Sequence, residues 1–183
     1  MPDLRESLLE LYQGLRADTR ERWQRDLPLQ ELLVDRWERA ASLGFGEGSS
    51  IYASSYVYGD VKVGRKTWIG PNTLLDGSGG LTIGDGCDIS AGVQIYTHDT
   101  VRRVVSEGRD DIEHAPVVIG DFTHLGAAAV VLKGVKIGDH CVIGAHALVR
   151  AEIPPFTIAA GVPCRPIGRV VIGGGGEVSF EYA

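Results

Sequence analysis

One histidine stands where the regular pattern of this chain breaks. His98 ends a run of aliphatic and small residues, and the segment after it, residues 101–115, carries arginines and acidic residues that no apolar core accepts. An imidazole gains and loses a proton near neutral pH, which suits a general base acting on a hydroxyl or an amine. A lone histidine is more often structural, but an outward position beside a projecting loop favours catalysis. We therefore predict that His98 is catalytic.

Other nucleophiles are less well placed. Cys87, Cys141 and Ser90 fall inside the regular pattern with no evident base beside them, so we expect the two cysteines to be buried packing residues. The three cysteines are widely spaced and odd in number, which argues against a disulfide framework and fits a reducing compartment.

The composition limits the possible partners. Hydrophobic residues make up 44% of the chain and charged residues 23%, and the net charge is −6. An acidic chain is a poor general surface for nucleic acid or anionic lipid. The N-terminal segment is charged throughout, unlike a signal peptide, and no run approaches the roughly 20 apolar residues that cross a bilayer. We expect a cytoplasmic protein that neither binds nucleic acid nor inserts into a membrane.

A repeat of six residues positions His98. From residue 51 onward the first position of each hexapeptide is aliphatic, the second is often glycine, and the fifth is small or β-branched. A two-residue slip occurs at Leu81 and Thr82. This period is typical of a parallel β-helix with a continuous aliphatic column, whereas a β-sandwich would show a period of two. The first positions are Ile51, Val57, Val63, Ile69, Leu75, Ile83, Ile89, Ile95, Ile119, Leu125, Val131, Ile137, Ile143 and Val149.

The flanking segments follow from the same pattern. The interval from Ile95 to Ile119 is a whole number of hexapeptides, so residues 101–115 must leave the helix as a protruding loop and return in register. Residues 3–23 and a segment from Pro28 to Gly44 are expected to form two helices that cap the first coil. We divide the chain into an N-terminal helical segment (1–46), a β-helix domain (47–168) and a tail (169–183) that is either a hairpin or a floppy extension.

The repeats resemble those of the hexapeptide-repeat acyltransferases over roughly residues 50–168. Residues 116–121, 137–145 and 153–165 are similar to the galactoside and maltose O-acetyltransferases and to acetyltransferases that modify polysaccharides. In that group a catalytic histidine stands just before the protruding loop, as His98 does. The resemblance implies a left-handed parallel β-helix of triangular section, with an N-terminal helical cap and a protruding loop.

The resemblance also implies a function. The implied function is the acetyl-CoA-dependent transfer of an acetyl group to a sugar hydroxyl of a saccharide or polysaccharide precursor. His98 would be the general base in a direct ternary complex, acetyl-CoA the co-substrate, and no metal would be needed. The protein would be a homotrimer with CoA bound between neighbouring helices.

Residues at the matching positions take the corresponding roles. The implied CoA contacts are Ala127, Ala145, Arg150 and Arg165, with Ala127 in place of a serine of the family. The implied acceptor contacts are Asn72, Asp76 and His124, the last of which replaces a tryptophan at the acyl site.

Several alternatives stay open at this level. The main one is an N-acetyltransferase acting on a nucleotide-linked amino sugar, because the same base serves both reactions. A γ-type carbonic anhydrase needs three zinc-binding histidines, and its close histidine pair is absent from this chain. A non-catalytic scaffold is the third. The residue that orients His98 is also open: Asp99 is next in sequence although strand neighbours point to opposite faces, and Asp110, Asp111 and Glu113 of the loop are as plausible. Lys133 and Lys136 either bind CoA phosphates or are simply solvated.

Overall fold

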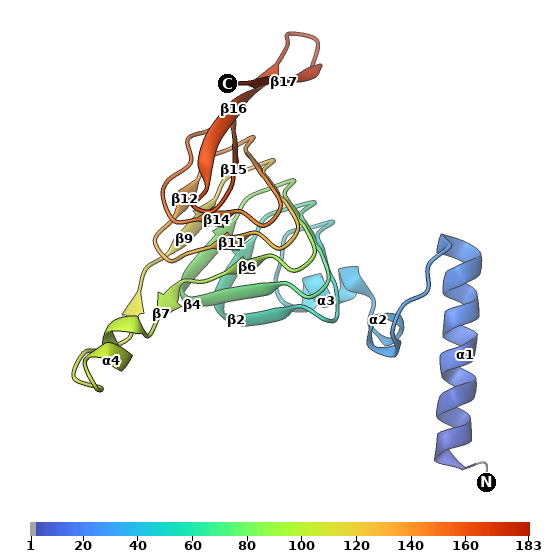
Figure 1. The fold of residues 1–183 in the computed structure, drawn as a ribbon. Helices are drawn as coiled ribbons and strands as arrows, with labels where there is room; N and C mark the ends of the chain where they lie inside the picture. Colours follow the sequence, from blue (N-terminus) through green and yellow to red (C-terminus); the bar gives the residue numbers. More distant parts are fainter. Residues whose placement is uncertain (1–2) are drawn as a thin grey trace.

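The computed structural model describes residues 3–183, and its body is a triangular parallel β-helix (Figure 1). Short parallel strands stack on three faces, and each coil contributes to each face in turn. The first face stacks β1 (Ser50–Ile51), β3 (Trp68–Ile69), β5 (Asp88–Ile89), β10 (His124–Leu125), β13 (Val142–Ile143) and β15 (Thr157–Ala160).

The other two faces share two long strands that turn a corner. These are β2 (Tyr56–Val63) and β4 (Leu74–Ile83), which pair with each other in parallel. The second face continues with β6 (Gln94–Ile95), β11 (Val130–Val131) and β14 (Leu148–Val149). The third face continues with β9 (Val117–Ile119), β12 (Lys136–Ile137) and a bridge from Ile137 to Ile153.

The first-position aliphatic residues form the predicted column. All of them are buried except Val57, which is partly buried against the core. Hydroxyls at the fifth position form hydrogen bonds between successive coils. For example, Thr123 Oγ1 donates to the Gly138 carbonyl at 2.9 Å. Cys87 and Cys141 occupy the same inward position, and burial raises the pKa of both thiols. The prediction that they are buried packing residues is confirmed.

Glycine at the second position lets the coils approach closely. A Cβ on Gly120 would collide with the Asp139 carboxylate and would lie 2.7 Å from the carbonyl carbon of Gly138. That carboxylate accepts a hydrogen bond from the Asp121 amide of the previous coil at 2.9 Å. The repeated glycine is therefore a requirement of coil spacing, since any side chain here would push two backbones apart.

The N-terminal helices differ from the prediction in two ways. Helix α1 (Leu4–Trp23) forms as expected, but it buries no residue and stands apart from the β-helix (Figure 1). The second helix is split into α2 (Leu29–Leu33) and α3 (Arg36–Ser42), because the Asp35 side chain caps a new helix start. The prediction that α1 caps the first coil is therefore wrong.

The cap itself is made by α2 and α3. Helix α3 packs against β1, and the Glu31 carboxylate of α2 accepts hydrogen bonds from the amides of Ala53 and Ser54, both at 2.9 Å. No helix within residues 3–183 is long and apolar enough to cross a membrane.

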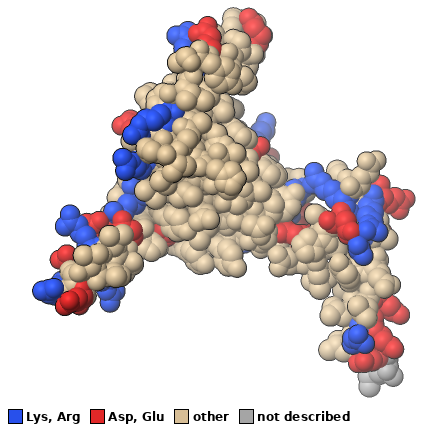
Figure 2. Space-filling view, viewed as in Figure 1, with Lys and Arg blue, Asp and Glu red and all other residues tan. Residues whose placement is uncertain are grey.

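The tail and the loop both project from the body. Strands β16 (Arg165–Ile172) and β17 (Val178–Tyr182) form an antiparallel hairpin, which decides between the two forms expected for the tail. The loop leaves through β7 (His98–Asp99), runs through α4 (Val101–Val105) and returns through β8 (Glu113–His114). Figure 2 shows charged side chains on these projections, on the N-terminal helices and along one edge of the body, whereas most of the visible body surface is uncharged.

The coil is closed directly beneath the loop. The Ala115 amide donates to the Thr97 carbonyl at 2.9 Å, so the chain that leaves after Thr97 re-enters beside it. The aliphatic column then resumes at Ile119 in the predicted register.

Candidate active site

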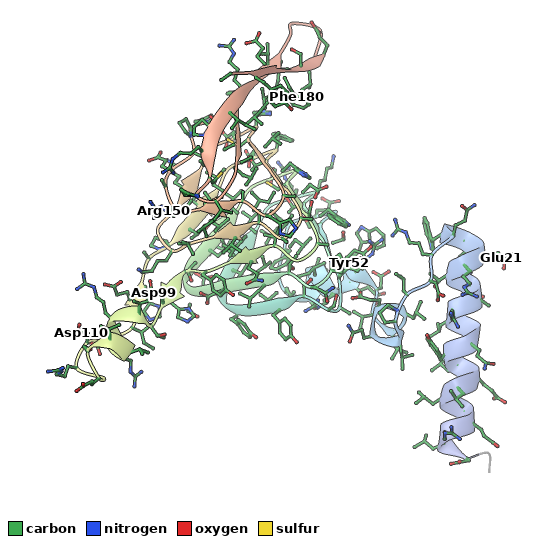
Figure 3. All side chains as sticks on the ribbon, viewed as in Figure 1. Glu21, Tyr52, Asp99, Asp110, Arg150 and Phe180 are labelled. Carbon is green, nitrogen blue, oxygen red and sulfur yellow. The ribbon has the colours of Figure 1, made fainter. Side chains whose placement is uncertain are left out.

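Two edges of the second face carry most of the predicted site residues. We call the edge that bears the loop the loop corner, made of residues 76–80, 97–98, 132–134 and 150–151. We call the opposite edge the alanine corner, made of residues 71–73, 91–93, 127–129 and 145–147. Figure 3 shows Asp99 and Arg150 along one edge of the body, above the loop that carries Asp110.

The structure brings only some of the predicted residues together. His98, Asp76 and Arg150 meet at the loop corner. Within one chain, the alanine corner holds Asn72, Ala127 and Ala145, where the His146 amide donates to the Ala127 carbonyl at 2.9 Å.

Two more predicted residues lie outside both corners. Arg165 opens β16, where it pairs with Ala160 of β15. His124 lies on the first face, with its Nδ1 3.7 Å from the Asp88 carboxylate. The three acceptor residues implied by the resemblance therefore do not form one cluster within a single chain.

A buried carboxylate orients His98. The Nδ1 atom of His98 lies 2.7 Å from Oδ2 of Asp76, whose side chain is 1% exposed while that of His98 is 35% exposed. A carboxylate can only accept here, so Nδ1 carries the proton and Nε2 is left with a free lone pair. The orienting residue was open among Asp99, Asp110, Asp111 and Glu113, and the structure places Asp76 in that position instead.

Asp76 is held as an anion by its hydrogen bonds. Burial alone would raise its pKa, but Ser78 and Thr97 donate to its two oxygens at 2.6–3.0 Å. His98 is the third residue that donates to this carboxylate. Together these donors outweigh burial and hold the pKa of Asp76 well below its ordinary value. Because this carboxylate is enclosed behind the imidazole, it is not available to an acceptor, and the acceptor role implied for Asp76 is corrected.

The two-residue slip of the repeat builds this arrangement. Asp76 follows Leu75, which pairs with Ile95 one coil above, so Asp76 lies under the chain leading to His98. The extra residues after Asp76 widen the corner, and the Gly79 amide there donates to Thr97 Oγ1 at 2.8 Å. Thr97 is fully buried and also donates to the Asp76 carbonyl at 2.9 Å. The irregular corner thus makes room for a carboxylate that a regular coil would not hold.

A lysine fixes the base of the loop. We call β7 and β8 together the loop neck. The ammonium of Lys133, one coil above, lies 2.6 Å from Asp99 and 2.9 Å from Glu113, which are opposite each other in the neck. Arg102 adds a contact to Glu113 at 2.8 Å. The hydrogen bonds to these carboxylates raise the pKa of Lys133.

Lys133 is therefore not a free cation for CoA phosphates, which was one of its two expected roles. Asp99 points away from His98 as predicted, and its pKa is lowered mainly by Lys133.

A groove runs beside His98 toward Arg150. It encloses about 450 Å³ and lies at the loop corner, where it is lined by residues that directly follow the strands of the second face. Arg150 is exposed and has no carboxylate partner within residues 3–183. The groove is therefore apolar over Tyr96 and Leu132 and positive at one end. The lining residues are Tyr96, His98, Asp99, Thr100, Val101, Leu132, Lys133 and Arg150.

The histidines are too dispersed for a metal centre. Among residues 3–183 no group of three His, Cys, Asp or Glu side chains is placed to hold a metal ion. His140, for example, stacks between Phe122 and Phe156 with ring centroids 5.2 and 4.9 Å away, at a corner remote from His98.

Sequence reasoning missed three residues of this site, Ser78, Thr97 and His114, and it missed the role of Lys133. The two-residue slip between Asp76 and Ile83 was the available signal, because counting coils with it included places Asp76 beneath residues 96–98. No comparable signal marked Lys133, since its two partners come from opposite ends of the loop.

Comparisons with known proteins agree with the fold and the repeat. The family described as bacterial transferase hexapeptide (six repeats) matches residues 116–151, and the hexapeptide repeat of succinyl-transferase matches residues 60–97. The chain is 33% identical over 118 residues to the galactoside O-acetyltransferase of Escherichia coli (strain K12), covering 63% of this chain and 57% of that protein. The chain thus spans little more than half the length of this curated relative.

Solved structures show the same architecture. A galactoside acetyltransferase in complex with coenzyme A superimposes with a TM-score of 0.66 at 26% identity, covering 92% of this chain and 85% of that one. AntD, an N-acyltransferase from Bacillus cereus in complex with dTDP and 3-hydroxybutyryl-CoA, matches with a TM-score of 0.58 over 71% of this chain and 86% of that one; at 20% identity it shows the fold alone. The chain contains hexapeptide repeats of the bacterial transferase type and is similar in sequence and fold to galactoside O-acetyltransferases.

Proposed function

We propose that this protein transfers an acetyl group from acetyl-CoA to a hydroxyl of a saccharide, with His98 as the general base. The observation that carries the proposal is the buried Asp76 carboxylate 2.7 Å from Nδ1 of His98. It sets the tautomer in which Nε2 accepts a proton, and it stabilises the imidazolium that then forms.

The reaction balances with these residues alone. Nε2 of His98 takes the proton of the acceptor hydroxyl as its oxygen attacks the thioester carbonyl. The new C–O bond forms, the C–S bond breaks, and the departing CoA sulfur takes the proton from the imidazolium. No covalent acyl-enzyme is needed, which fits the burial of all three cysteines.

The groove beside His98 suits the donor. Its apolar floor over Tyr96 and Leu132 fits the pantetheine chain, and the unpaired Arg150 fits a phosphate. The family resemblance and the CoA-bound relative support the same co-substrate.

The remaining implied CoA residues call for a neighbour. Ala127 and Ala145 lie across the second face from His98, and Arg165 lies beyond them. In the homotrimer that we propose, the alanine corner of one subunit faces the loop corner of the next, which encloses CoA between two chains. Asn72 and His124 would reach an acceptor only across such an interface.

The first test is thiol release from acetyl-CoA over a panel of saccharides that includes galactosides and nucleotide-linked amino sugars. We expect one saccharide class to drive turnover, and His98→Ala to lose at least ~100-fold in kcat while still binding CoA by calorimetry. His140→Asn is the matched control, because asparagine tolerates the positive φ of this remote residue. Retention of activity by His98→Ala would refute the base assignment, and failure of the wild type to bind CoA would refute the transferase.

The same panel separates O- from N-acetylation. The fold does not decide between them, because an N-acyltransferase shares it. If an amino sugar is turned over but its hydroxyl analogue is not, the acceptor group is an amine rather than a hydroxyl. The proposed role of His98 would be unchanged.

A further inference from the structure

The loop neck is a ribbon with two chemically different sides. Its register pairs His98 with His114 and Asp99 with Glu113. Because side chains alternate along a strand, both carboxylates point to one side, where Lys133 of the coil above holds them. Both imidazoles point to the other side, toward the coil of Asp76, with their ring centroids 5.7 Å apart.

The carboxylate side of the neck is already occupied. Lys133 and Arg102 neutralise Asp99 and Glu113, and the groove on this side leads along Leu132 to Arg150. That direction suits the phosphates and pantetheine of the donor. On the imidazole side Asp76 holds His98, but His114 is exposed and its side chain makes no hydrogen bond within residues 3–183.

Two tyrosines continue the imidazole side. Tyr58 pairs in register with Asp76, so it lies one coil below the carboxylate that holds His98. Tyr58 is 49% exposed and its neighbour on the same face, Tyr56, is 60% exposed. Their ring centroids are 6.1 Å apart with a 30° angle between the planes, so the two rings form one aromatic surface on this coil.

We propose that the acceptor saccharide binds on the imidazole side of the neck. A hydroxyl of the sugar would bond to His114, and the sugar ring would pack on Tyr58 and Tyr56. The proposal rests on the proposed function and locates the acceptor subsite. Sugars present both apolar C–H faces and hydroxyls, and tyrosine offers an apolar ring with a polar tip. Tyr58 lies one coil below Asp76 and His114 lies beside His98, so a saccharide bound across them would bring a hydroxyl near Nε2. Donor and acceptor therefore approach His98 from opposite sides of one ribbon.

The experiment measures which substrate each variant affects. For the saccharide with the highest turnover in the panel, we expect His114→Phe to raise the acceptor KM about 5-fold, the value of one neutral hydrogen bond, and Tyr58→Ala to raise it by at least as much. The KM for acetyl-CoA should stay unchanged in both. Arg150→Ala is the matched counterpart and should raise the KM for acetyl-CoA alone. Both imidazole-side residues are exposed, so the variants should fold as the wild type does.

Three results would overturn the subsite. One is an acceptor KM within 2-fold of wild type in both variants. Another is an equal rise in both KM values. The third is a change in oligomeric state on size-exclusion chromatography for Tyr58→Ala, which would assign the tyrosines to an interface between copies.

A binding measurement keeps the subsite separate from the reaction. Saturation-transfer NMR with methyl β-galactoside and the other panel saccharides needs no turnover. We expect a signal in the wild type that Tyr58→Ala loses. A signal unchanged by the variant, or none from any saccharide, would contradict the subsite, whereas loss of CoA binding bears only on the proposed function.

Discussion

The two edges of the second face are built from the same repeat but differ in how strictly they follow it. At the alanine corner each coil repeats the last, and backbone bonds of 2.9 Å join Gly92 to Pro71, Ala128 to Ala91 and His146 to Ala127. At the loop corner one coil gains two residues after Asp76 and the next gains a loop after His98. A strictly repeated coil presents the same surface at every level, so it cannot make one side chain unlike its neighbours. The departures from the repeat supply that difference.

The largest effect should come from removing the charge behind the histidine. In Asp76→Asn the shape is kept, but the amide can donate to Nδ1 and hold the tautomer whose Nε2 cannot accept. We expect kcat to fall by ~100-fold or more, with the KM for acetyl-CoA nearly unchanged. Steady-state kinetics check this.

The matched control is Asp88→Asn, which removes a carboxylate beside the other paired histidine, His124, on the regular first face. Equal losses of kcat in the two variants would mean that the carboxylate at the loop corner contributes no more to catalysis than the one on the first face.

The same carboxylate should make stability depend on pH. The folded pKa of Asp76 lies below its unfolded value of about 4, so its stabilisation is complete above that pH and is lost as the pH falls toward the folded pKa. We expect Asp76→Asn to lower the free energy of unfolding by about 2 kcal/mol near pH 7 and by progressively less below pH 4. Chemical denaturation at several pH values measures this, and a pH-independent difference would contradict it.

The ion pairs of Lys133 with the loop neck should affect kcat less than the Asp76 carboxylate does. Lys133→Met keeps the length of the side chain but leaves Asp99 and Glu113 facing each other without a cation. We expect faster proteolysis within residues 101–115 and a fall in kcat of about 10-fold, because His98 is then held less firmly. Lys136→Met, an exposed residue of the third face, should change neither. Unchanged protease resistance in Lys133→Met would show that Lys133 does not hold the loop neck in place.

The smallest effect belongs to the regular edge. Ala127 replaces a serine of the family, so Ala127→Ser should restore a hydrogen bond and lower the KM for acetyl-CoA by ~2- to 10-fold with kcat unchanged. Ala91→Ser introduces the same hydroxyl one coil lower in the same corner and serves as the control. If both variants behave alike, the alanine corner does not contact CoA in the way we propose.

The sequence predicted the regular parts of the molecule better than the irregular ones. The aliphatic positions from Ile51 to Val149 and the return of the chain at Ile119 were readable, because a repeat of six reports its own register. The position of His98 at the break in the repeat was also predictable, and its catalytic role stays a prediction. The pairing with Asp76 was not predictable, since it depends on which coil lies beneath which, and the slip moves that count by two residues.

Helix α1 shows a different limit. Its leucines predicted a helix correctly, because periodicity is a local property of the chain. What covers its apolar stripe is a tertiary question, and Leu4, Leu8 and Leu11 remain exposed in the single chain. Periodicity alone therefore predicted the element but placed it wrongly over the first coil.

The hydrogen bond from Ala115 to Thr97 makes the loop separable from the scaffold that carries it. The ends of the insert are joined by the coil itself, so the entropy of closing it depends only weakly on its length. Evolution and engineering can thus exchange residues 100–112 for shorter or longer segments without disturbing the aliphatic column. A set of such exchanges would vary the wall of the acceptor subsite that we propose while His98 and Asp76 stay fixed, so the same proposed base can be tested against many substrates.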